Sequence, residues 1–176
     1  MNKIKYLPHS TKCFVCGRKN PVSLKHLFYV EDDFVCSDIF IPDGYNGFKG
    51  IVHGGIATAL LDETMGWCAY VFGNGKNLYF TRKLQIKFKK SLYIEHSYKV
   101  VTNFTDEKKG IVTVKGKIID KNENILVEGE GYFVEIPDNK MKETIQYLLF
   151  DKDKIYLEKI VNRIKELQVE DSQQRK

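Results

Sequence analysis

Alternation of hydrophobic and polar positions is the main pattern in the second half of the chain. In segment 78–90, Leu84, Ile86 and Phe88 alternate with lysine and glutamine, which is typical of a strand with one buried face. Polar turns separate this strand from further segments rich in Val, Ile, Tyr and Phe. We expect two strands within 24–41, followed by strands over 78–90, 93–104, 111–119 and 125–136.

One long apolar segment interrupts these strands. From Ile56 to Phe72 the chain has very few polar residues, and the Gly-Asn-Gly sequence at 73–75 ends the segment. A helix that is apolar nearly all round is buried. The order β-β-α-β-β-β-β therefore predicts an α+β fold, in which a curved antiparallel sheet wraps around one long central helix.

The pattern changes after Pro137. Apolar residues recur at helical spacing from Ile145 to Leu167. We expect a domain over 1–136, with a distinct N-terminal segment at 13–21, and a C-terminal helical extension over 137–176. The extension either packs back on the domain or presents a helix to a partner.

Composition and charge narrow the class of protein. A chain of 176 residues is about one domain in length. With 43% hydrophobic and 29% charged residues, it is neither disordered nor fibrous. Asp62 and Glu63 interrupt the most apolar stretch, which argues against a membrane span. No apolar stretch follows Met1 as in a secretory signal, so we expect a cytoplasmic protein.

The basic excess is small, with 28 Lys and Arg against 23 Asp and Glu and a net charge of +5. A nucleic-acid-binding protein usually concentrates its charge in a patch. Here only one run stands out, and we expect no nucleic-acid partner. The run either binds a small anionic ligand or is an exposed strand face that deters edge pairing; it contains Arg82, Lys83, Lys87, Lys89 and Lys90.

Candidate chemistry begins at His53-Gly54-Gly55, where a loop becomes the N-terminus of the buried helix. The first backbone N–H groups of a helix have no internal acceptor and carry the positive end of the helix dipole. They can stabilise an oxyanion, and glycines let a ligand carbonyl come close. The alternative is a tight turn in which the histidine caps the helix.

Asp62 is the second candidate, because an ionised carboxylate is costly to bury without a partner. It either meets a structural polar partner or lines a functional cleft. Glu63 points about 100° away around the helix, and for it we favour a surface or salt-bridged role. Asp62 lies roughly 12 Å along the helix axis from Gly54, which is too far for one small substrate group to reach both. We therefore infer that Gly54 of one chain faces Asp62 of another across a two-fold dimer.

The sequence over 46–63, which contains His-Gly-Gly and Asp62, resembles the hotdog-fold acyl-CoA thioesterases of the phenylacetyl-CoA thioesterase-like type. Segment 81–90 is similar to the next strand of that family, and Cys13-Phe14-Val15-Cys16-Gly17 is similar to the start of one subgroup. The resemblance covers about residues 13–136. It implies hydrolysis of an acyl-CoA thioester to free acid and CoA, in a homodimer or dimer of dimers with shared active sites.

The resemblance also implies roles for individual residues. Asp62 would activate water or act as the nucleophile, and the Gly54 N–H would polarise the thioester carbonyl. His53 would orient the loop or the substrate, Asn46 would hold water or the carbonyl, and Thr81 would assist the carboxylate. Period-two alternation sets Thr81 opposite to Leu84, so its direction depends on a twist or bulge. The substrate-binding candidates are Gly55, Glu63, Arg82 and Lys83, the last two for CoA phosphates.

Two other functions stay open on the same fold: a non-catalytic acyl-thioester-binding or regulatory module, and a dehydratase acting on acyl thioesters. Cys13 and Cys16, with His9 and His26 nearby, suggest zinc only weakly, because a structural site needs four ligands. Cys36 and Cys68 are expected to be buried apolar residues. We expect neither a metal nor an organic cofactor.

Overall fold

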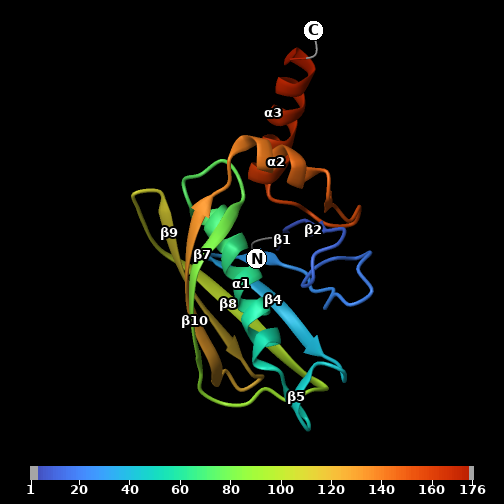
Figure 1. The fold of residues 1–176 in the computed structure, drawn as a ribbon, viewed down its shortest axis with the longest axis vertical. Helices are drawn as coiled ribbons and strands as arrows, with labels where there is room; N and C mark the ends of the chain where they lie inside the picture. The colour runs from blue at the N-terminus through green and yellow to red at the C-terminus, as the bar shows by residue number, and fades with distance from the viewer. Residues whose placement is uncertain (1–3, 175–176) are drawn as a thin grey trace.

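The computed structural model describes residues 4–174 and contains a curved antiparallel sheet of seven strands with one long helix, α1, packed against it (Figure 1). Residues 1–3 and 175–176, which the expected domain limits include, lie outside the described residues. The elements are β1 (Lys5–Tyr6), β2 (His9–Ser10), β3 (Tyr29–Glu31), β4 (Phe34–Ile41), β5 (Asn46–Phe48), β6 (Ile51–Val52), α1 (Gly54–Phe72), β7 (Tyr79–Phe88), β8 (His96–Lys108), β9 (Ile111–Ile119), β10 (Ile125–Glu135), α2 (Asp138–Ile145), β11 (Leu148–Leu149) and α3 (Glu158–Gln174).

The sheet has the strand order β1-β3-β4-β8-β9-β10-β7, and every neighbouring pair is antiparallel. The two strands expected within 24–41 form the β3–β4 hairpin, and the four later strands are also confirmed. β8 runs to Lys108 rather than 104, because its polar end still pairs with the start of β9. β1, β2, β5, β6 and β11 were not predicted, since two or three residues are too few to show a period.

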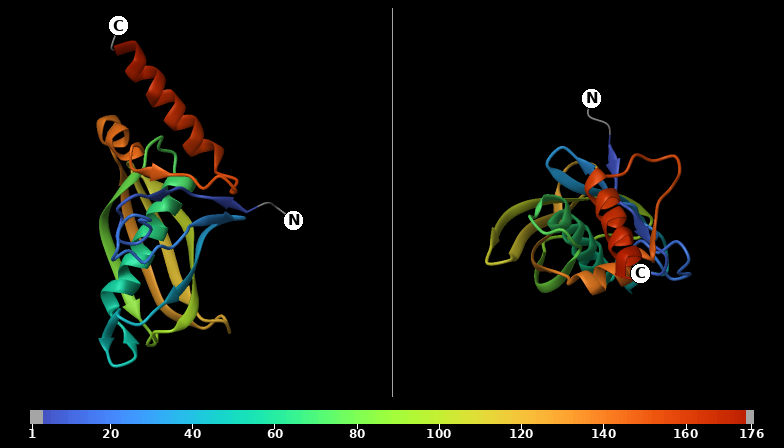
Figure 2. Two further views of the ribbon diagram at one scale, coloured as in Figure 1. Left: turned by 90° about the vertical axis from the view of Figure 1, so that its right-hand side faces the viewer. Right: turned by 90° about the horizontal axis from the view of Figure 1, so that it is seen from above.

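The core lies between α1 and the sheet. Leu60, Leu61 and Met65 of the helix are fully buried. Gly116 on β9 allows the close approach of the helix, because a Cβ there would lie 3.0 Å from Leu61 Cδ2 and 3.1 Å from Met65 Cγ. The loops of the N-terminal segment cover another side of α1, so the helix lies between the sheet and these loops (Figures 1 and 2).

The C-terminal extension packs back on the rest of the chain. Ile160 and Leu167 of α3 are fully buried, although the end of the helix projects beyond the sheet (Figure 2). Lys159 Nζ donates hydrogen bonds to the Tyr70 carbonyl at 2.7 Å and the Gly73 carbonyl at 3.0 Å. These carbonyls lie at the C-terminal end of α1, where a cation is favoured.

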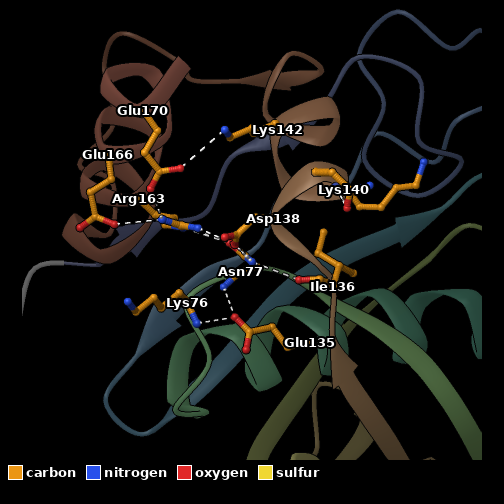
Figure 3. A network of polar contacts seen from close by, with 11 residues as sticks. Lys76, Asn77, Glu135, Ile136, Asp138, Lys140, Lys142, Arg163, Glu166 and Glu170 are labelled. Carbon is orange, nitrogen blue, oxygen red and sulfur yellow. Dashed lines mark hydrogen bonds and ion pairs between the residues drawn. The ribbon is translucent and has the colours of Figure 1, made fainter. Parts of the chain in front are cut away.

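Arg163 is the centre of the polar network that holds the extension (Figure 3). Its guanidinium donates to Asn77 Oδ1 at 2.9 Å and to Asp138 Oδ1 at 2.7 Å, and its side chain is 7% exposed. Asn77, in turn, donates to the Ile136 carbonyl at 3.1 Å. The network therefore joins α3 to the loop after α1 and to the start of α2.

We expect Arg163→Met to lower the free energy of unfolding by about 2 kcal/mol, because the buried side-chain oxygen of Asn77, Oδ1, would lose its donor. Lys140→Met is the control, since the Lys140–Glu143 pair is exposed and should contribute less than about 0.5 kcal/mol. Urea denaturation of both variants measures the difference. Equal stabilities would show that the network contributes nothing beyond a surface pair.

Among the described residues, no helix is both long and apolar enough to cross a membrane.

Candidate active site

His53 is the N-cap residue of α1. This residue is extended, with φ −61° and ψ 133°, and its Nδ1 accepts a hydrogen bond from the Gly55 N–H at 2.9 Å. The cap lets the helix begin at Gly54, two residues earlier than the expected Ile56. Because the ring of His53 accepts from this N–H, the Gly55 N–H is already engaged, and a substrate-binding role of Gly55 stays a prediction.

Gly54 is the first helical residue, so its own N–H has no acceptor within the helix. It lies in a cavity of about 580 Å³ between the β5–β6 loop and the end of β7. Lining residues include Phe48, His53, Phe88 and Lys90. This opening therefore combines apolar walls, one backbone donor at the positive end of a helix, and lysine at its edge.

Asp62 lies on α1 about two turns after Gly54, and its partner is Thr81 of β7. The Thr81 hydroxyl donates to Asp62 Oδ1 at 2.7 Å. A register shift makes this contact possible: Tyr132 of β10 pairs with Lys83 while Phe133 pairs with Thr81, which leaves Arg82 as a bulge. The extra residue turns Thr81 toward the helix, contrary to simple alternation from Leu84.

The Asp62 carboxylate lines a small cavity of about 120 Å³ together with Glu63, Trp67, Tyr79 and Thr81. Burial raises the pKa of Asp62 above its ordinary value, and the hydrogen bond from Thr81 partly opposes this rise. The carboxyl group is thus more basic than a surface aspartate, while one of its oxygens stays engaged with the hydroxyl.

Glu63 points toward the N-terminal segment, and the expectation of a surface or salt-bridged role is wrong. Its Oε1 lies 3.5 Å from the Cys13 Sγ and 3.7 Å from the Cys16 Sγ. Burial, more than its neighbours, raises the pKa of Glu63 to about 8. Within the described part of the chain, Glu63 forms no ion pair with Lys, Arg or His. Its partners are two thiols, which the spacing of the sequence could not indicate.

The side chain of Asn46 is bound to Asp43. Its side-chain amide is exposed and donates to Asp43 Oδ1 at 2.7 Å, and Asn46 lines neither the Gly54 cavity nor the Asp62 cavity. The role of Asn46 toward water or the carbonyl therefore stays a prediction.

The basic residues on β7 and just after its end divide into two groups. Lys87 and Lys89 form ion pairs with Glu128 at 3.9 Å and 2.5 Å. Arg82 is exposed and forms no ion pair among residues 4–174, and the Lys83 Nζ lies 5.3 Å from the centre of the Tyr132 ring. Arg82 and Lys83 are thus more available than Lys87 and Lys89 for an anionic ligand.

The structure brings the predicted residues together in two separate places. His53 and Gly54 line one cavity, and Asp62, Glu63 and Thr81 line the other, with no lining residue in common. The separation agrees with the roughly 12 Å of helix between Gly54 and Asp62.

Residues 49–127 match the family model "Thioesterase superfamily". Comparison with curated proteins gives no match. Among solved structures, the thioesterase superfamily protein RHA08564 is 22% identical with a TM-score of 0.64, and the match covers 70% of this chain and 60% of that one. This chain therefore spans less than two thirds of that protein.

Two smaller neighbours have the same fold. Protein smu.793 from Streptococcus mutans UA159, bound to acetyl CoA, is 15% identical with a TM-score of 0.55, over 60% of this chain and 83% of that one. The E. coli PaaI protein from the phenylacetic acid degradation operon is 11% identical with a TM-score of 0.54, over 60% and 79%. The chain thus has the hotdog fold of these structures, and its residues 49–127 match the thioesterase superfamily model.

Proposed function

We propose that this protein is an acyl-CoA thioesterase, which hydrolyses its substrate to a free acid and CoA at sites shared between two chains. The observation that carries the proposal is the half-buried Asp62 carboxylate held by the Thr81 hydroxyl at 2.7 Å. The match of residues 49–127 to the thioesterase superfamily model and the acetyl CoA in the Streptococcus mutans neighbour support the choice of substrate class.

In the proposed reaction, Asp62 removes a proton from water as the resulting hydroxide adds to the thioester carbonyl. Thr81 holds Oδ1, which leaves Oδ2 to face the water. The Gly54 N–H donates to the oxyanion of the tetrahedral intermediate. The carbon–sulfur bond then breaks, and the CoA thiolate takes the proton from Asp62. Direct attack by Asp62 on the carbonyl, followed by hydrolysis of the anhydride, needs the same two groups.

The edge strand β7 supports the two-chain arrangement. It ends the sheet, and Phe80 and Phe88 on it are 54% and 55% exposed. Large apolar side chains along an unpaired edge favour association with another chain. Phe88 also lines the Gly54 cavity, so a partner covering this edge would approach the backbone donor.

Arg82 and Lys83 are proposed to bind the phosphates of CoA. Both lie on the exposed side of β7, close in sequence to Thr81. Guanidinium groups can bind phosphate with two parallel hydrogen bonds. We also retain the division into a hotdog domain at 1–136 and an extension at 137–176. The cytoplasmic location stays a prediction.

The direct test is hydrolysis of a panel of short, long and aryl acyl-CoAs by the purified full-length protein. Free acid and CoA are measured by chromatography and mass spectrometry, because the four cysteines would react with a thiol reagent. We expect turnover of at least one thioester. Ligand-induced stabilisation without turnover would instead favour the acyl-thioester-binding module, and addition or loss of water would identify a dehydratase.

The shared site has its own test, in mixed dimers of one Asp62→Asn chain and one Gly54→Pro chain carrying different affinity tags. If each site takes Asp62 from one chain and Gly54 from the other, a mixed dimer keeps one complete site and about half the normal activity. If both groups come from the same chain, every site is defective. Activity no higher than that of the parent variants would overturn the two-chain arrangement.

We expect Thr81→Val to lower kcat by about 10-fold, because the Asp62 carboxylate would lose the hydrogen bond that positions it. Thr81→Ser keeps the hydroxyl and should retain most of the activity. The comparison is made with the best substrate of the panel, with kcat and KM measured separately. A Thr81→Ser variant as poor as Thr81→Val would indicate that packing of the methyl group matters instead.

A further inference from the structure

Cys13 and Cys16 form a compact turn around their sulfur atoms. The Cys13 Sγ accepts hydrogen bonds from the Val15 N–H at 3.2 Å and the Cys16 N–H at 3.4 Å. The turn closes with the Gly17 N–H, which donates to the Cys13 carbonyl at 2.9 Å. Backbone donors aimed at sulfur stabilise the thiolate form, which is the form that binds a metal.

The second sulfur is held in a similar way from outside the turn. The Ser10 N–H donates to the Cys16 Sγ at 3.3 Å. Cys16 is buried, whereas Cys13 is only partly buried and remains accessible from one side. The two sulfur atoms thus have three backbone donors and an open side.

Glu63 of α1 completes the group. Its Oε1 is 3.5 Å from one sulfur and 3.7 Å from the other, and the three possible ligand atoms lie within 4.8 Å of one another. With zinc–sulfur bonds of 2.3 Å and a zinc–oxygen bond of 2.1 Å, tetrahedral geometry separates sulfur from oxygen by about 3.6 Å. The two sulfur–oxygen distances therefore already match a common central ion.

The chemistry of the group also favours a cation. Even a partly buried carboxylate costs free energy unless a cation or several donors face it. Glu63 has only the two thiols as partners and no ion pair among the described residues. Two thiolates and one carboxylate form a donor set suited to a thiophilic divalent cation such as zinc.

We propose that Cys13, Cys16 and Glu63 bind one zinc-class divalent cation, which fastens the N-terminal segment to α1. Water entering on the Cys13 side fills the fourth position. This proposal is independent of the thioesterase function and revises the expectation of no metal. The two histidines near in sequence are not ligands, because neither His9 nor His26 belongs to the group. Glu63 replaces them, from a helix that lies far away in sequence.

The test uses the full-length protein, purified with a reductant, incubated with zinc and freed of loosely bound metal by gel filtration. We expect about one zinc per chain by elemental mass spectrometry. After exchange with cobalt, we expect the near-ultraviolet charge-transfer absorption of a thiolate–cobalt bond. Cys13→Ser and Cys16→Ser should lose both signals, whereas Glu63→Gln should weaken zinc affinity at least about 10-fold.

Cys36→Ser is the matched control, because Cys36 is a buried thiol that does not belong to the group. It should retain one zinc and the cobalt spectrum. Wild-type protein without zinc and without the charge-transfer band would overturn the proposal, even if the serine variants fail to fold. A Cys13–Cys16 disulfide that persists in reductant would also overturn the proposal. The same holds if Cys36→Ser loses as much zinc as the Cys13 and Cys16 variants. Unchanged affinity in Glu63→Gln would overturn the role of Glu63.

Discussion

Replacement of Asp62 by asparagine is expected to lower kcat by about 10²–10⁴-fold, which is the usual contribution of a general base. The amide is nearly isosteric and can still accept the hydrogen bond from Thr81, now 2.7 Å from Oδ1. It cannot take a proton from water or attack the thioester. The loss should therefore appear in kcat, with a smaller effect on KM.

Asp38→Asn provides the matched control. Asp38 also accepts a hydrogen bond from a hydroxyl, that of Tyr29 at 2.9 Å, but lies on β4 outside the two cavities of the site. Its replacement should leave turnover within a few-fold of the wild type. Near-normal hydrolysis by Asp62→Asn, with the oligomer unchanged by sedimentation, would refute the proposed role of Asp62.

Replacement of Gly54 by proline is expected to lower kcat by about 10²–10³-fold, the cost of losing one oxyanion donor. Proline removes the backbone N–H and is well tolerated at the first position of a helix. His53 already has φ −61° and ψ 133°, the conformation that a residue before proline prefers. The substitution therefore removes the donor with little change to the helix.

Gly54→Ala separates the donor from the steric effect. It keeps the N–H and adds a Cβ that would lie 3.3 Å from Phe88 Cζ, a contact that the phenylalanine ring can relieve by a small shift. We expect this variant to retain activity within about 10-fold of the wild type. Equal losses in the alanine and proline variants would indicate that crowding at Phe88, not the N–H, controls the rate.

The fold follows largely from local patterns, because period-two strands and an apolar helix leave few ways to bury both. The direction of Thr81 could not be predicted, since it depends on which residue of β7 is left out of the pairing with β10. The sequence allows a capping bond from His53 as one of two alternatives, and this bond decides which glycine keeps a free N–H. Contacts between distant segments, such as Glu63 with Cys13, carry no local signal in one sequence.

The bulge at Arg82 also restricts how this chain can meet another. An extended partner needs a regular row of backbone groups, and the irregularity breaks that row near the start of the exposed edge. Only the stretch over 83–88 keeps a regular pattern of backbone hydrogen-bonding groups. A strand paired there one residue out of register would turn its apolar side chains to the opposite face of the sheet. A single inserted residue thus orients a hydroxyl toward the helix and would also limit the alignment of any strand that paired with this edge.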